Sequence, residues 1–90
     1  MEQEERLRLD ILEISQSRRN VTNDDMLRVL NRLATIVPVT IRDTGHGLMV
    51  TLPNAILRIC THHKGSKQIK VCYVNNFLDA MRELGFFEDE

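Results

Sequence analysis

Residues 39–60, VTIRDTGHGLMVTLPNAILRIC, decide the fold class of this chain. Apolar and polar side chains alternate along residues 39–42 and again along 48–52, the period of strands that bury one face. A turn with two glycines, residues 43–47, joins the two runs and predicts a hairpin. Residues 55–61 are rich in Ile and Leu and predict a third strand. We therefore expect a small antiparallel sheet in the middle of the sequence.

Helical periodicity precedes this strand region. Residues 2–17 carry apolar side chains at helical spacing with charges between them, which predicts an amphipathic helix. Thr22 is a candidate N-cap for a second helix, and the residue before Pro38 disfavours helical angles. The second helix should therefore run from Thr22 towards Pro38.

A further helix is expected after the strands. Asn75 or Asn76 is a candidate N-cap, and Gly85 is a favourable residue for the C-terminal end. Before it, residues 67–73 have the length and composition of a short fourth strand.

The predicted fold class is α+β, in the order helix, helix, three strands, an optional fourth strand and helix. A chain of 90 residues suits a single domain, 1–90. Within it we expect an extra N-terminal helix, 1–20, and an α-β-β-β-α core, 22–87. The small antiparallel sheet should pack against the helices.

The composition indicates a globular protein. The chain is 42% hydrophobic and 28% charged, unlike disordered segments. No apolar run approaches the roughly 20 residues that a membrane span needs, and the acidic first ten residues do not resemble a signal peptide. We expect a cytoplasmic protein with reduced thiols and no membrane partner.

The formal net charge of −1 is unevenly distributed. Residues 44–78 contain no Asp or Glu but have one Arg and three Lys, so this stretch carries +4. Such a stretch favours a phosphate-bearing partner. The alternative is a solvated sheet face whose lysines are balanced by carboxylates from the chain ends.

Three short stretches resemble a known family. They are TGHGLMV at 44–50, the basic loop HHKGSKQIK at 62–70 and RELGF at 82–86. From about residue 24 onward the chain resembles HicA proteins, small toxins of bacterial toxin–antitoxin modules with a fold like that of double-stranded-RNA-binding domains. The helix at 2–17 has no counterpart in the family pattern.

The resemblance implies RNA cleavage, with RNA and a protein antitoxin as partners. His46 would be the catalytic residue, because an imidazole titrates near neutral pH and can act as general acid or base. The alternative is a turn histidine chosen for its tolerance of positive φ. The residues expected to contact nucleic acid are Arg58, His62, His63, Lys64, Lys67 and Lys70.

Two other interpretations stay open. Cys60, His62, His63 and Cys72 have the donor atoms of a zinc site, but their spacing lacks a Cys-x-x-Cys knuckle, so no metal and no cofactor are expected. The chain is alternatively a protein-interaction module or homodimer that uses a sheet edge and the first helix. The helix residues proposed for this contact are Leu7, Leu9, Ile11, Leu12 and Ile14.

Overall fold

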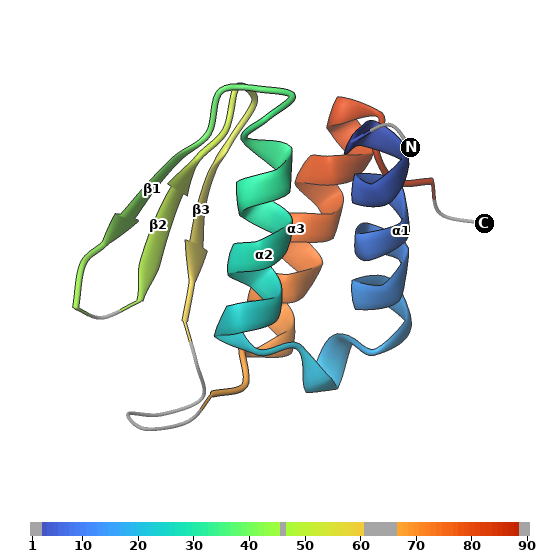
Figure 1. The fold of residues 1–90 in the computed structure, drawn as a ribbon. Coiled ribbons are helices and arrows are strands. Elements are labelled where there is room, and N and C mark those ends of the chain that lie inside the picture. Colours follow the sequence, from blue (N-terminus) through green and yellow to red (C-terminus); the bar gives the residue numbers. More distant parts are fainter. Residues whose placement is uncertain (1–2, 46, 61–66, 89–90) are drawn as a thin grey trace.

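The computed structural model describes residues 3–45, 47–60 and 67–88 and has three layers (Figure 1). A sheet forms the first layer, α2 and α3 form the second, and α1 lies on the side of these helices away from the sheet. The predicted α+β class and the order of helices and strands are confirmed. The elements are α1 (Gln3–Gln16), η1 (Arg18–Asn20), α2 (Asn23–Leu33), β1 (Thr40–Asp43), β2 (Leu48–Thr51), β3 (Ile56–Ile59) and α3 (Val71–Leu84).

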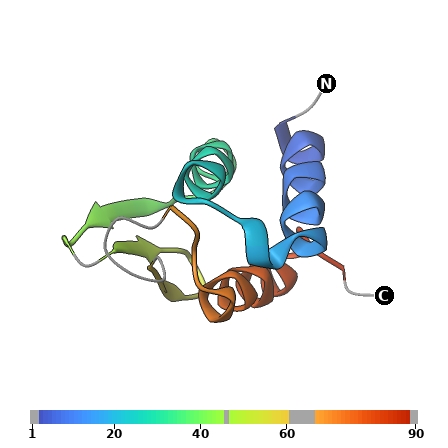
Figure 2. The same ribbon diagram turned by 90° about the horizontal axis from the view of Figure 1, so that it is seen from below.

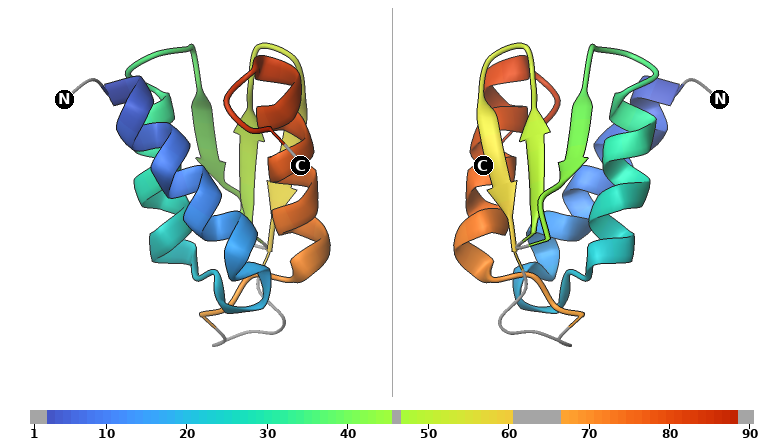
Figure 3. Two further views of the ribbon diagram at one scale, coloured as in Figure 1. Left: turned by 90° about the vertical axis from the view of Figure 1, so that its right-hand side faces the viewer. Right: turned by 90° about the vertical axis from the view of Figure 1, so that its left-hand side faces the viewer.

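The strands form an antiparallel sheet in the order β1-β2-β3. Because side chains alternate along each strand, Val50, Leu57 and Ile59 point inward and are buried. Figures 2 and 3 show both α2 and α3 on this inner face, with no described element over the other face. One face of the sheet is therefore core and the other is surface.

The start of α2 follows the sequence prediction. The Asp25 N–H donates to Thr22 Oγ1 at 3.2 Å, and the Thr22 N–H donates to Asp25 Oδ2 at 3.1 Å. This reciprocal capping box satisfies two backbone donors at the helix start. The helix ends at Leu33, before Pro38, and a turn closed by an Ile36 N–H bond to the Leu33 carbonyl oxygen follows it.

The start of α3 differs from the prediction. The helix begins at Val71, so neither Asn75 nor Asn76 is its N-cap, and the cap residue Lys70 makes no side-chain cap bond. Within the described residues, bridge residues Gln68 and Ile69 take the place of a fourth strand before α3, and Gln68 pairs antiparallel with Thr22. Because the helix starts early, Val74 is buried one turn before Phe77 and Leu78. This burial outweighs the preference of residues 67–73 for a strand.

The C-terminal end of α3 is as predicted. Gly85 adopts a left-handed φ of +86°, and the Phe86 N–H donates to the Met81 carbonyl oxygen at 2.9 Å. Phe86 is buried against the core. This is the glycine cap with a hydrophobic residue folded back on the helix.

The first helix is part of the same core. Leu7, Ile11 and Ile14 are buried, and they belong to one apolar cluster that extends through α2 and α3 to the sheet. Partly buried Asp10 and Arg32 form an ion pair between α1 and α2. Among the helices that the structure describes, none has the length and hydropathy to cross a membrane.

The β1–β2 turn contains two glycines, Gly45 and Gly47, whose neighbouring atoms differ. Gly47 has a φ of +140°, and a Cβ added there would lie 2.7 Å from the Ile59 carbonyl oxygen and 2.5 Å from the Cys60 Sγ. Gly45 has a φ of +82°, and an added Cβ would meet nothing within 4 Å. Only Gly47 is required both by its backbone angle and by a close approach.

We expect Gly47→Ala to lower the thermal unfolding midpoint more than Gly45→Ala does. The Gly45 change should cost about 1–2 kcal/mol, the usual strain of a left-handed residue. The Gly47 change adds a steric clash with the end of β3. Thermal unfolding followed by circular dichroism measures both, and equal losses would contradict the close packing at Gly47.

Candidate nucleic-acid interface

The outer face of the sheet carries a row of two arginines and a methionine. Met49 of β2 pairs with Arg42 of β1 on one side and with Arg58 of β3 on the other. Strands lie about 4.8 Å apart, so the backbones of the two arginines are about 10 Å apart across the sheet. Both arginines are exposed.

This outer face contains no acidic side chain on the strands that the structure describes. Alternation places six residues on it: Thr40, Arg42, Met49, Thr51, Ile56 and Arg58. The outer face of the strands therefore carries two positive charges and no negative charge.

The two arginines differ from most of those on the α-helices. Arg8, Arg28, Arg32 and Arg82 each form an ion pair with an Asp or Glu. Within residues 3–45, 47–60 and 67–88, neither Arg42 nor Arg58 forms one. The outer-face charges are thus not neutralised by ion pairs with described carboxylates.

Lys67 and Lys70 lie at the end of the molecule where β3 ends and α3 begins (Figure 1). The Lys67 carbonyl oxygen accepts from the Asn23 N–H at 3.0 Å, and the Lys70 N–H donates to the Cys60 carbonyl oxygen at 3.1 Å. Between them Ile69 is fully buried, while both lysines are exposed. The bond to Cys60 places Lys70 beside the end of β3, and the bond from Asn23 places Lys67 beside the start of α2.

Three of the six residues predicted to contact nucleic acid lie in the described part of the chain. They are Arg58, Lys67 and Lys70. The other three, His62, His63 and Lys64, lie outside the described residues, as does the predicted catalytic residue His46.

Tyr73 lies at the same end, in the first turn of α3. Its side chain hydrogen-bonds with Cys60. The negative charge of a Cys60 thiolate is the main reason that the pKa of Tyr73 is raised from 10.0; desolvation adds to this, and Arg58 lowers it. The phenol therefore stays neutral at physiological pH and adds no charge to the surface.

Sequence reasoning missed Arg42. The acid-free stretch was counted from Thr44, so Arg42 fell outside it. The signal was present in the alternation of 39–42, which already placed Arg42 on the polar face, but only the strand register shows that this residue shares a row with Arg58.

The apolar residues proposed for partner binding divide into two groups. Leu7, Ile11 and Ile14 are buried in the core of the chain itself. Leu9 and Leu12 are 54% and 44% exposed. The candidate apolar surface on α1 therefore narrows to these two leucines.

No family model, curated protein or solved structure matches this chain. The HicA resemblance thus remains a prediction from the sequence stretches quoted above. In the part of the chain that the structure describes, no three His, Cys, Asp or Glu side chains gather as a metal site.

Proposed function

We propose that this domain binds RNA through a basic surface formed by Arg42, Arg58, Lys67 and Lys70. The observation that carries the proposal is the acid-free outer face of the sheet, with two arginines in one cross-strand row and no described ion pair to neutralise them. The order α2-β1-β2-β3-α3, with both helices on one face, agrees with the fold that the resemblance implies.

The chemistry of the surface favours contacts to the backbone of the RNA. An arginine guanidinium donates two parallel hydrogen bonds to a phosphate, which makes it well suited to this contact. The outer face has no aromatic side chain on which bases would stack, so base-by-base readout is not expected there. Recognition through phosphates and helix shape needs only the cations that are present.

Cleavage is the second part of the proposal. His46 follows β1 in the turn bounded by Gly45 and Gly47, and this turn meets the end of β3, because Gly47 packs against Ile59 and Cys60. His46 itself lies outside the described residues, and its part in the proposal comes from the sequence resemblance. It would act as general acid or base on a ribose hydroxyl or leaving oxygen.

The double change Arg42→Gln/Arg58→Gln should weaken binding to a labelled structured RNA. Loss of two phosphate contacts should also flatten the dependence of log affinity on log salt by about 1 for each contact. Fluorescence anisotropy over a series of salt concentrations measures both quantities.

The matched control is Arg6→Gln/Arg19→Gln. It removes the same charge from exposed arginines outside the basic surface, for which no ion pair is seen among the described residues. If both double variants weaken binding equally, net charge rather than the sheet face is responsible and the proposed surface is wrong.

His46→Ala should abolish cleavage of the same RNA and leave its affinity nearly unchanged. The reason is that the imidazole is proposed to move protons and not to hold phosphate. Gel analysis of end-labelled RNA, run beside the anisotropy titration, separates the two effects. Wild-type protein that binds without cleaving would leave an RNA-binding domain and remove the nuclease part.

A protein-interaction role is a second candidate, favoured by the exposure of Leu9 and Leu12 on α1. Leu9 also lines a hollow of about 290 Å³ beside Arg6, Asp10, Glu13 and Arg32. An apolar side chain of a partner or of a second copy would contact the two exposed leucines, with the charged residues of the hollow around this contact.

Leu9→Glu should shift a self-associating protein towards monomer, because it places a charge in an apolar contact. Gln16→Glu adds the same charge on the same helix and should leave the association state unchanged. Sedimentation velocity at several concentrations measures this, and a wild-type protein that stays monomeric throughout would remove the homodimer form of this candidate.

A further inference from the structure

Strand β3 is an edge strand whose outward backbone groups can be assigned. The Leu52 N–H donates to the Ala55 carbonyl oxygen at 2.8 Å. This bond shows which residue pairs of β2 and β3 are hydrogen-bonded to each other and which are not. In an antiparallel pair, alternate residues bond to the neighbouring strand. Leu57 therefore bonds to β2, whereas the N–H and C=O groups of Ile56 and Arg58 point away from it, over the open edge.

These four outward groups have no hydrogen-bond partner among the residues that the structure describes. The same edge exposes Ile56, which is 69% accessible. Natural edge strands are commonly protected by a short length, charged side chains, proline, a bulge or a covering helix or loop. The strand Ile56–Ile59 is short and carries Arg58, but it contains no proline, and its outward backbone groups are unbonded within the described residues and so available for pairing.

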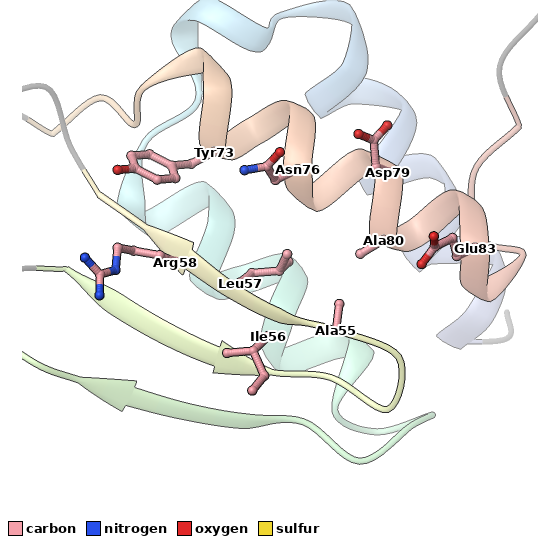
Figure 4. A pocket seen from close by; sticks show the side chains of 9 residues that line it. All are labelled: Ala55, Ile56, Leu57, Arg58, Tyr73, Asn76, Asp79, Ala80 and Glu83. Atoms are coloured by element: carbon pink, nitrogen blue, oxygen red, sulfur yellow. The ribbon is translucent and has the colours of Figure 1, made fainter.

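A groove of about 270 Å³ lies along this edge, between β3 and α3 (Figure 4). One wall is the strand, and the other is a face of α3 with residues at helical spacing. The lining residues on the helix are Tyr73, Asn76, Asp79, Ala80 and Glu83. The floor is small and apolar, with Ala55 and Leu57 from the strand side.

The two ends of the groove carry opposite charges. Arg58 and Tyr73 lie at one end, and Figure 4 shows Glu83 at the other, beyond Ala80. Asp79, on the adjacent turn, is paired with Arg82. Asn54 donates to the Glu83 carboxylate at 3.0 Å and to the Ala80 carbonyl oxygen at 3.3 Å, which holds this end in place. A bound segment would therefore lie in the groove in one preferred orientation.

We propose that the groove takes an extended segment of a partner protein, which adds to the sheet as a strand beside β3. Its backbone pairs with the outward groups of Ile56 and Arg58. An acidic side chain of the segment lies by Arg58, and a basic one lies by Glu83.

The shape of the site favours a single segment over a second copy of the domain. The groove is walled by α3, and a second copy joined edge to edge would bring its own α3 to the same side of the sheet. An extended segment brings only one strand. Strand addition of this kind obtains affinity from main-chain hydrogen bonds and specificity from alternate side chains.

The test is selection of a displayed library of random ten-residue peptides against the folded protein, without RNA. We expect enriched peptides with β-forming residues, an acidic residue and a basic residue several positions away. The amides of Ile56 and Arg58 should become protected from hydrogen exchange when a selected peptide binds. Absence of enrichment would overturn the proposal.

Two variants locate the site. The Ile56 N–H points outward and makes no hydrogen bond to β2, so an edge position tolerates Ile56→Pro. The change removes one donor for the bound segment and should weaken the affinity for a selected peptide about tenfold. Asn76→Phe should fill the groove from the helix side, whereas Cys72→Phe, also exposed on α3 but outside the groove lining, should have no effect. Peptides that bind all variants equally, or a concentration-dependent dimer that Ile56→Pro abolishes, would overturn the assignment to a partner segment.

Discussion

The fold depends on a short bridge between the two segments that lead into α2 and α3. Thr22 pairs with Gln68, the Ile69 N–H donates to the Val21 carbonyl oxygen at 2.8 Å, and Val21 and Ile69 are both buried. This bridge joins parts of the chain that are far apart in sequence and starts both helices at one end of the sheet. Both helices therefore cover the same face of the sheet, and no described element covers the opposite face.

The same arrangement explains why α1 is needed. A three-stranded sheet with two helices leaves apolar residues on the far side of those helices, and Val29 of α2 lies beside Ile14 of α1 there. Leu7, Ile11 and Ile14 of α1 cover that side. The first helix is thus a third layer of one core. Its two exposed leucines, Leu9 and Leu12, are not part of that core.

Local signals predicted most of the fold. The alternation along 39–60, the Thr22 cap and Gly85 each act within a few residues, and each has the predicted role in the structure. The start of α3 was missed because it depends on burial of Val74 and Ile69 against distant elements. For the same reason the sequence indicated Arg58, Lys67 and Lys70 but not the cross-strand partner Arg42 or the groove beside α3, which exist only once the strands are in register and the helix is docked.

The uncovered face of the sheet has a consequence for how this protein changes over evolutionary time. Each strand carries two interleaved sets of residues, and only the inward set is constrained by packing. Substitutions on the outward set leave the core untouched and usually alter stability by no more than about 0.5 kcal/mol. Selection can therefore change the chemistry of this face at Thr40, Met49 or Thr51 without altering the packing of the core.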